Sequence, residues 1–199
     1  MSKLIKIMLF TSGVTIATAV AFFSMQNKEI SRMIPKQLLE GEIEAAPMVK
    51  NFESLPEGIE ITRLVVLKGR RQMFAYNGDK LIKIYPISLG FNPIGHKQFE
   101  GDGKTPEGIY TINERNKNSS YHKNLGISYP NSQDKAFAEA QGKSAGGLIK
   151  IHGLRNGFGD IGRNHLLKDW THGCIAVTNE EIDELFLSVI HRAEIEIKP

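Results

Sequence analysis

Three β-strands joined by tight turns are predicted by the stretch 61-ITRLVVLKGRRQMFAYNGDKLIKIY-85. It is rich in β-branched, aliphatic and aromatic residues, a composition typical of strands. The three strands cover residues 62–68, 72–76 and 80–85. Asn77 and Gly78 lie between the last two, and both tolerate the positive φ that a two-residue hairpin turn requires. We therefore expect the folded domain to begin near Gly58 with a β-meander.

The remainder of the domain is predicted to add further strands and two helices, which gives a mainly β fold of the α+β class. Further strands are expected at residues 108–112, 127–129, 148–152 and 193–197. Ser132 is expected to cap a helix that runs through residues 134–140 and ends at Gly142. Residues 178–181, TNEE, form a capping box, so a second helix is expected directly after it.

Three other segments are predicted to be loops. Residues 113–124 are polar and are expected to lie on the surface. Residues 153–170 are rich in glycine and asparagine, and long loops of this kind in compact domains are usually functional or disordered. Residues 101–106, GDGKTP, look like the end of a phosphate-binding loop, but Gln98 occupies the place of that motif's first glycine. We therefore interpret this segment as a tight loop that leads into the next strand.

The N-terminal segment has the charge pattern of an export signal. Residues 7–25 carry no charge and follow two lysines, as in a positive n-region followed by an apolar h-region. We expect residues 1–25 to be a signal peptide or a membrane anchor, because the uncharged run also nearly matches the length that spans a bilayer. Residues 26–57 are interpreted as a linker, and residues 58–199 as a folded domain in the periplasm.

The composition argues against a nucleic-acid partner. The chain has 25 basic and 22 acidic residues, a net charge of +3, and no run of lysine or arginine is interleaved with aromatic residues. Its hydrophobic content of 41% is that of a globular domain. One hydrophobic core is therefore expected.

Cys174 is the only cysteine in the sequence, and it lies two residues after a histidine. In an oxidising compartment a lone cysteine is a buried inert residue, an intermolecular link or a reactive thiol. A thiol attacks as the thiolate, and a nearby imidazole is the usual means of activating it. His152 and His172, each followed by glycine, are the candidate bases.

Three uses of these residues are open at this point. The first is nucleophilic catalysis by Cys174 with a histidine base. The second is a zinc site whose ligands would be His152, His165, His172 and Cys174. Structural zinc sites generally have more closely paired ligands than these. The third use is a structural cysteine beside core histidines. We favour catalysis and expect no metal and no cofactor.

Two motifs in this region resemble a known family. Residues 151–153 (IHG) and 171–175 (THGCI), separated by the long glycine-rich segment, resemble the signature of the L,D-transpeptidases with a YkuD-type catalytic domain, which remodel bacterial peptidoglycan. Residues 101–108, GDGKTPEG, and the capped helix after Cys174 are also similar to segments of the family. The resemblance covers about residues 60–198 and implies a single mixed, β-sandwich-like catalytic domain.

The resemblance implies a role for each motif residue. Cys174 would attack the amide between the third residue of a peptidoglycan stem peptide and its terminal D-alanine, forming a thioester, with His152 as general base and acid. The carbonyl of Gly153 would orient the imidazole. The oxyanion site and its support would involve Thr171, His172, Gly173 and Cys174. An amine of a neighbouring stem peptide or of a wall-anchored protein would resolve the thioester, whereas water would make the enzyme a carboxypeptidase or an amidase.

The sequence departs from the family pattern directly after the nucleophile. Many members have arginine or asparagine two residues after the cysteine, a polar group suited to binding substrate, whereas this chain has Ala176. Lys150 and Arg155, on either side of His152, are the candidate substrate-binding residues instead. The alternative to an enzyme is a non-catalytic wall-binding module in which Cys174 is structural.

Overall fold

The computed structural model describes residues 54–199. The export segment 1–25 and nearly all of the linker 26–57 lie outside these residues, so both stay predictions. Within residues 54–199, no helix is long and apolar enough to cross a membrane.

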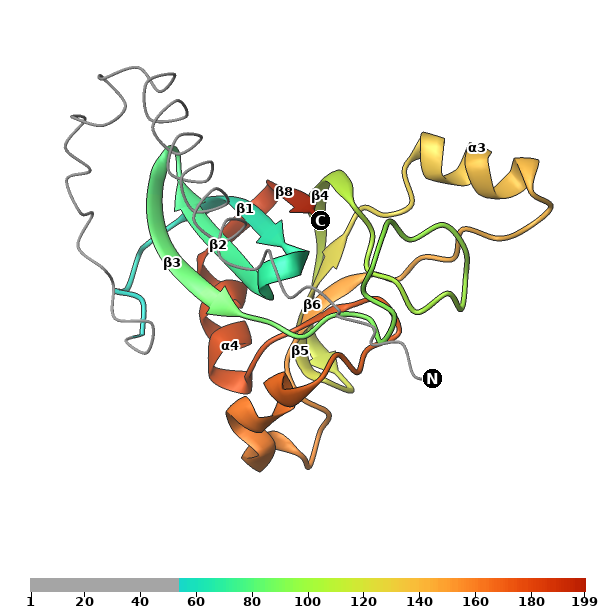
Figure 1. The fold of residues 1–199 in the computed structure, drawn as a ribbon. Coiled ribbons are helices and arrows are strands. Elements are labelled where there is room, and N and C mark those ends of the chain that lie inside the picture. The colour runs from blue at the N-terminus through green and yellow to red at the C-terminus, as the bar shows by residue number, and fades with distance from the viewer. Residues whose placement is uncertain (1–53) are drawn as a thin grey trace, which may run out of the picture. The chain divides into compact units, whose positions relative to one another are not determined.

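Residues 54–199 form one mixed sheet of eight strands (Figure 1), in the order β3-β2-β1-β8-β4-β5-β6-β7. The strands are β1 (Ile61–Leu67), β2 (Gln72–Asn77), β3 (Lys80–Pro86), β4 (Gly108–Ser119), β5 (His122–Ile127), β6 (Lys150–His152), β7 (Ile175–Ala176) and β8 (Val189–Lys198). The helical elements are α3 (Ser132–Ala140), α4 (Asn179–Ser188) and the 3-10 segments η1 (Lys68–Arg70) and η2 (Gly159–Leu167). The predicted fold class, mainly β with helices, is confirmed.

The first three strands form the predicted meander. β1, β2 and β3 pair antiparallel in sequence order. The turn between β2 and β3 lies one residue later than predicted, at Gly78 and Asp79. Asn77 stays extended in the ladder opposite Lys80, so within this turn the positive φ, 55°, belongs to Gly78.

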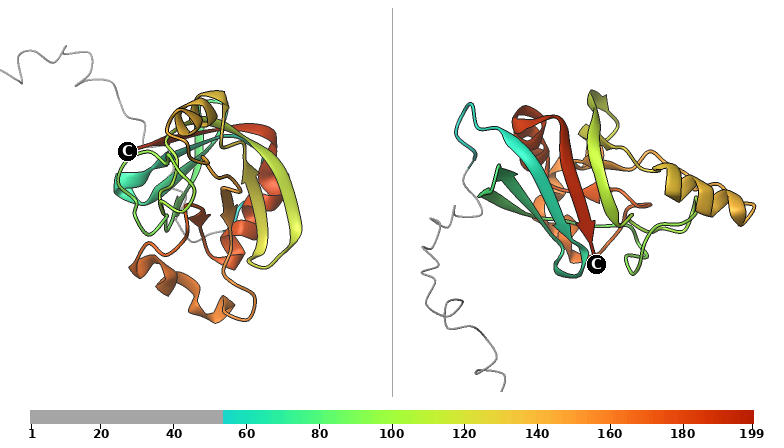
Figure 2. Two further views of the ribbon diagram at one scale, coloured as in Figure 1. Left: turned by 90° about the vertical axis from the view of Figure 1, so that its right-hand side faces the viewer. Right: turned by 90° about the horizontal axis from the view of Figure 1, so that it is seen from above.

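The strand β8 lies in the middle of the sheet, between β1 and β4. It pairs parallel with β1 and antiparallel with β4, and the right-hand view of Figure 2 shows it, in red, flanked by both. Ala193, Ile195 and Ile197 are buried, which confirms the alternating pattern predicted for residues 193–197. The strand also extends back to Val189.

The segment 113–124, predicted to be a surface loop, instead forms the outer part of a long hairpin. β4 continues to Ser119 and β5 begins at His122. The two strands pair antiparallel, with Asn116 opposite Asn124. The loop prediction is wrong because the side chains of this hairpin border solvent and a cavity, so its strands carry polar residues without an apolar alternation.

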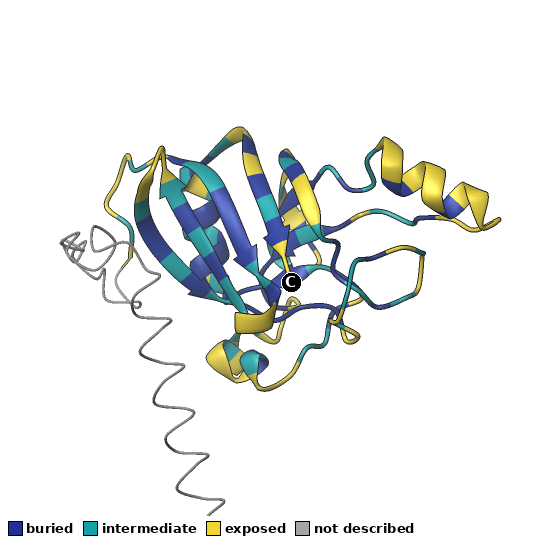
Figure 3. Ribbon diagram, turned by 45° about the horizontal axis from the view of Figure 1, so that its top comes forward, coloured by how far each residue is buried: buried dark blue, intermediate teal, exposed yellow. Residues whose placement is uncertain are grey.

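Two local details also differ from the predictions. The strand expected at 127–129 contributes only its first residue, because β5 ends there. Helix α3 is capped by Asn131 rather than Ser132, since the Asn131 side chain accepts hydrogen bonds from the N–H groups of Gln133 and Asp134. The Asp134 side chain completes a capping box with Asn131, so the cap lies one residue earlier than expected. Figure 3 shows this helix standing away from the sheet and mostly exposed.

Helix α4 covers β5 and β6. Its capping box is the predicted one: Thr178 Oγ1 accepts from the N–H of Glu181, and the Glu181 carboxylate accepts from the N–H of Thr178. Ile182 and Leu185 of this helix are fully buried and belong to the same core as Ile151 of β6. Burying each such side chain contributes about 1.5–3 kcal/mol, so the core fixes the strand that carries the His-Gly pair.

The segment after β3 crosses to the opposite end of the sheet, where β7 lies. It leaves β3 after Pro86, and then Ser88 forms a bridge with Ala176 while Gly90 forms one with Thr171. A Cβ on Gly90 would lie 2.1 Å from the carbonyl oxygen of Gly103. Glycine at this position therefore lets the loop after residue 100 pack beside the cysteine motif.

Residues 101–106 form a tight loop, as predicted. The Asp102 carboxylate accepts hydrogen bonds from the N–H groups of Gln98, Phe99 and Lys104. These amides are therefore engaged within the loop and are not presented to a phosphate group.

Candidate active site

A cavity of about 510 Å³ lies beside β5 and β6. Cys174 and His152 both line it, together with Lys150, Thr171 and His172. Its other walls come from the β4–β5 hairpin, the residue Leu148 and the residue Trp170. The fold thus brings the two His-Gly motifs, which are far apart along the chain, to one cavity.

Thr171 stabilises the turn that carries the candidate nucleophile, Cys174. Thr171 Oγ1 donates to the carbonyl oxygen of Cys174 at 2.7 Å and accepts from the N–H of Gly173 at 3.1 Å. Gly173 has a φ of 131°, and a Cβ there would lie 2.6 Å from the carbonyl oxygen of Lys104. Both the backbone conformation and the lack of space therefore require glycine at this position.

The Cys174 thiol is half-buried, and its proton is retained at neutral pH. Burial raises the pKa of Cys174, while the backbone N–H of Lys150 and the charges of Lys150 and Lys97 oppose that shift. The Sγ–H donates a hydrogen bond of 3.6 Å to the carbonyl oxygen of Leu148. A thiol in this state requires a base to accept its proton as it attacks.

His152 presents the nitrogen that a base requires. Its Nδ1 lies 2.7 Å from the carbonyl oxygen of Gly153, and a carbonyl can only accept, so Nδ1 carries the proton. In the neutral ring Nε2 is then the acceptor. Burial lowers the pKa of His152, with the Gly153 hydrogen bond acting in the opposite direction. The imidazole is therefore neutral at pH 7 and able to accept a proton.

Gly153 packs the backbone of this strand end against helix α4. A Cβ on Gly153 would lie 2.7 Å from Asn179 Oδ1 and 2.9 Å from Ile182 Cγ2. The same Asn179 oxygen accepts a hydrogen bond from the N–H of Leu154. The first turn of α4 therefore fixes the backbone that carries His152.

Two aromatic side chains pack against the His152 ring. Tyr121, at the tip of the β4–β5 hairpin, has its ring centroid 4.7 Å from that of His152, and Trp170 lies edge-on at 5.7 Å. Tyr121 and Trp170 also stack on each other at 6.2 Å. Tyr121 was not among the predicted site residues, because residues 113–124 were predicted to form a surface loop. The cluster of asparagine and serine at 116–120, between two strand-forming runs, is the hairpin signal that could have found it.

The backbone N–H groups of the cysteine turn differ in what they bind. The N–H of Gly173 donates to Thr171 Oγ1, whereas those of His172 and Cys174 donate to no protein acceptor among the described residues. The His172 ring is exposed and packs edge-on against Phe91, with centroids 5.5 Å apart. The amides of His172 and Cys174 are thus the ones that this turn leaves available to an oxyanion.

Lys150 reaches across the neighbouring strand to form an ion pair with Glu114. Gly126 of β5 lies between them in the sheet register. A Cβ on Gly126 would lie 2.8 Å from the Cβ of Glu114, so the ion pair passes over a glycine. Lys150 is therefore held at the edge of the cavity by a partner of its own.

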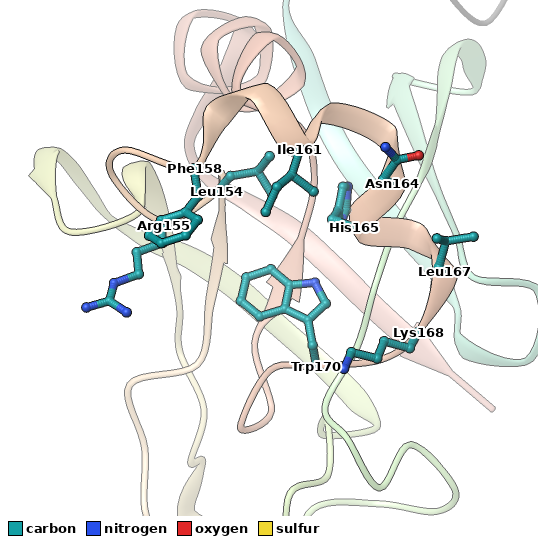
Figure 4. Close-up of a pocket in the computed structure, with 9 residues that line it drawn as sticks. All are labelled: Leu154, Arg155, Phe158, Ile161, Asn164, His165, Leu167, Lys168 and Trp170. Carbon is teal, nitrogen blue, oxygen red and sulfur yellow. The ribbon is translucent and has the colours of Figure 1, made fainter.

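A second cavity, of about 500 Å³, shares Trp170 with the first (Figure 4). Its lining is mostly apolar and includes Phe158 and Ile161. Arg155, a predicted substrate-binding residue, lines this cavity and not the one that holds Cys174. Its guanidinium points outward in Figure 4 and lies 5.8 Å from the centre of the Phe158 ring. The structure thus separates Arg155 from the cysteine.

His165 lines the second cavity and has partners of its own. Ser88 Oγ donates to the His165 carbonyl oxygen at 2.9 Å and lies 3.2 Å from the His165 Nδ1. Burial, together with the neighbouring His152 and Arg163, lowers the pKa of His165 to about 4. The residues of the zinc alternative are not gathered into one ligand set, since within residues 54–199 no three potential ligands cluster.

Comparison with known proteins identifies the domain. The L,D-transpeptidase catalytic domain model, YkuD, matches residues 61–197. A curated relative from Escherichia coli K12, named "Putative L,D-transpeptidase YafK", is 33% identical over 109 residues, which cover 54% of this chain and 37% of that protein. The chain therefore spans little more than a third of the length of this relative.

A solved structure shares the fold. The helical cell shape determining protein Pgp2 from Campylobacter jejuni matches with a TM-score of 0.53 and 26% identity, over 75% of this chain and 51% of that chain. The family match includes both the IHG motif at 151–153 and the THGC motif at 171–174. Since it covers more than half of the sequence, the chain belongs to the family of YkuD-type L,D-transpeptidase catalytic domains.

Proposed function

We propose that the protein is a cysteine L,D-transpeptidase that acts on the stem peptides of bacterial peptidoglycan. The observation that carries the proposal is the cavity shared by Cys174 and His152, in which Gly153 holds the proton on Nδ1 and leaves Nε2 as the acceptor. Family membership supports the substrate class. The likeness to Pgp2, named as a cell shape determinant, supports a role in cell-wall biogenesis and cell shape.

In the acylation step, Cys174 gives its proton to Nε2 of His152 as Sγ attacks the carbonyl carbon before the terminal D-alanine of the stem. The amides of His172 and Cys174 stabilise the oxyanion that forms. The C–N bond then breaks, the imidazolium gives its proton to the departing nitrogen, and D-alanine leaves. The acyl group remains on Cys174 as a thioester. A neutral thiol beside a neutral imidazole is the resting state that this general-base route requires.

In the second step, an amine of a neighbouring stem peptide or of a wall-anchored protein attacks the thioester. His152 accepts a proton from that amine, the S–C bond breaks, and the proton returns to the thiolate. Water is the second candidate acceptor, and it would make the protein a carboxypeptidase or an amidase. Ala176 favours this alternative, because its buried methyl group offers no polar contact to an incoming peptide directly after the nucleophile.

Mass spectrometry of muropeptides incubated with the purified protein tests the proposal and separates these outcomes. Transpeptidation would produce cross-linked dimers together with free D-alanine. Hydrolysis would produce stems shortened by D-alanine, or a released wall protein, without new dimers. Cys174→Ala should abolish every product, and turnover retained in that variant would rule out the thioester route. A wall-binding module without catalysis predicts no change in mass and unaltered binding after the thiol is blocked.

We also propose that the domain works in the periplasm. The substrate class requires a location outside the cytoplasmic membrane, which agrees with the export pattern of residues 1–25. Residues 26–57 would then link the anchor or cleaved signal to the domain. Fractionation of cells that produce the chain with and without residues 1–25 tests this, and retention of the full chain in the cytoplasm would contradict it.

A further inference from the structure

We propose that the second cavity binds an acyl chain of an anionic membrane lipid, so that the η2 side of the domain lies on a membrane surface. This cavity of about 500 Å³ is separate from the one that holds Cys174, although Trp170 lines both. Its volume is that of pockets that bind small molecules, about 300–1,000 Å³. The inference goes beyond the proposed function and does not depend on it, because no step of that reaction uses this cavity.

The walls of the second cavity are largely apolar. Leu154 lies just after the His-Gly pair, Phe158 directly precedes η2, and Ile161 belongs to η2. Figure 4 shows Leu154 and Ile161 on the side of the cavity opposite the Trp170 indole. A hydrocarbon chain gains free energy by leaving water for such walls and loses no hydrogen bond there. The cavity therefore suits an acyl chain better than a peptide or a sugar, whose polar groups would be left unpaired.

Three large apolar side chains of this cavity are open to solvent. Leu167 is 86% exposed, Phe158 is 51% exposed and Ile161 is 42% exposed. Single exposed apolar residues are common on proteins, but a group of them around one cavity is typical of a surface that another apolar body covers. All three belong to η2 or adjoin it, as on the apolar side of a segment that lies in a membrane interface.

The charged residues of this cavity are basic. Arg155 and Lys168 line it, and none of the described residues that line it is acidic. Neither side chain forms an ion pair with any of residues 54–199. Asp169, next to Lys168 in the sequence, is paired with Arg71 instead. Two cations without carboxylate partners, beside an apolar cavity, complement an anionic head group that carries a hydrocarbon chain.

A membrane is the source of this chemistry that fits the whole surface. A free amphiphile would fill the cavity but leave the side chain of Leu167 in water, whereas a bilayer covers both. Each lysine or arginine near an anionic bilayer raises the affinity about fivefold. The uncharged residues 7–25, predicted to be an export signal or an anchor, would bring the domain to such a surface. The occupant is therefore a lipid of the membrane itself.

Fluorescence of Trp170 tests this proposal, because it is the only tryptophan in the chain and it lines the cavity. The full chain is titrated with vesicles whose acyl chains carry bromine, which quenches tryptophan emission on contact. We expect vesicles of phosphatidylglycerol to quench Trp170. Vesicles of phosphatidylcholine should require about tenfold more lipid for the same quenching, because they lack the net negative charge. Insertion of residues 1–25 alone leaves Trp170 without contact to bromine and gives no signal.

Matched variants separate the cavity from a general attraction between charges. Lys168→Glu should raise the lipid concentration for half-maximal quenching about tenfold. Lys135→Glu, on the exposed side of α3, changes the net charge equally and should raise it less than about twofold. Ile161→Asp places a carboxylate in the apolar wall and should abolish quenching. Leu187→Asp makes the same kind of change at an 81% exposed position of α4 that does not line the cavity, and quenching should persist.

Several results would overturn the lipid site and leave the transpeptidase proposal standing. One is the absence of quenching by phosphatidylglycerol. Another is an equal shift in Lys168→Glu and Lys135→Glu, which would show general adsorption. Dodecyl phosphate, added below its micelle concentration, tests the other source: a change in Trp170 emission with this free amphiphile but no quenching by vesicles would exclude a membrane lipid. Cys174→Ala should be quenched as the parent is, because lipid binding does not use the thiol.

Discussion

The ring centroids of Tyr121 and His152 lie 4.7 Å apart, although the tyrosine is at a hairpin tip and the histidine ends a three-residue strand. The imidazole is thus packed on one side by a ring and tied at Nδ1 to Gly153. Asn156 fastens the hairpin, because its side chain bonds the backbone on both sides of the tip. The β4–β5 hairpin is therefore part of the active-site structure.

Removal of the Tyr121 ring should slow acylation without unfolding the domain. Tyr121→Ala frees the His152 ring to rotate, so we expect thioester formation to slow about 10- to 100-fold. Tyr121→Phe keeps the ring and should stay within about threefold of the wild type. Intact-protein mass spectrometry of the acyl-enzyme over time measures both rates. Equal rates for Tyr121→Ala and the wild type would show that the ring does not orient the base.

A side chain at residue 173 should disrupt the nucleophile turn. Gly173→Ala combines a strained φ with an overlap on the Lys104 carbonyl, and we expect a loss of stability of about 3 kcal/mol together with loss of acylation. Gly157→Ala is the matched control: its φ is 85°, but nothing lies within 4 Å of a Cβ there. Its cost should be about 1 kcal/mol. Urea unfolding measures the free energy of unfolding of both variants. Equal losses in the two would show that the Lys104 carbonyl is not what excludes a side chain at residue 173.

Alkylation of Cys174 should reveal a raised thiol pKa. Burial raises the pKa of Cys174 above its ordinary value of 9.0, and the charge of Lys150 acts against that shift. The reaction with iodoacetamide should therefore keep accelerating above pH 9.0. Lys150→Met should move the pH–rate curve to higher pH, whereas Lys168→Met, at the second cavity, should leave it in place. A curve that levels off below about pH 8 would contradict the raised pKa.

Acid should destabilise the domain through His165. Burial lowers its pKa to about 4 in the folded protein from 6.5, so the unfolded chain binds the proton first as the pH falls. The free energy of unfolding should drop between pH 6.5 and pH 4 and then level off, by about 3 kcal/mol from this group. Urea unfolding at several pH values should show a shallower slope for His165→Gln. Identical slopes would show that His165 does not titrate in this way.

Elements that are determined by residues close together along the chain could be predicted from the sequence. The capping box at 178–181 and the hairpin near Gly78 depend on residues that are neighbours along the chain, so their signals survive without knowledge of the fold. The spacing of His152 and Cys174 predicted one site, and the structure places both residues on one cavity. The hydrogen bonds of Thr171 also stay within the motif.

Features that depend on long-range pairing could not be predicted in this way. The strands at 113–124 are recognisable only through their partners, because their polar side chains face solvent and the cavity rather than the core. Tyr121 was missed for that reason. Arg155 lies three residues after His152, yet the chain turns beyond Gly153 and carries it to the other cavity. Proximity in sequence therefore misplaced it.

The central position of β8 has a consequence for biosynthesis. Residues 189–198 follow every other strand of the described chain, yet they separate β1 from β4 in the sheet. Until β8 has emerged, β1–β3 and β4–β7 have no strand to join them. Ile197 pairs with Val66, a contact of very long sequence separation, and such contacts form late and slowly. The two halves of the sheet can therefore join only after β8 has been synthesised.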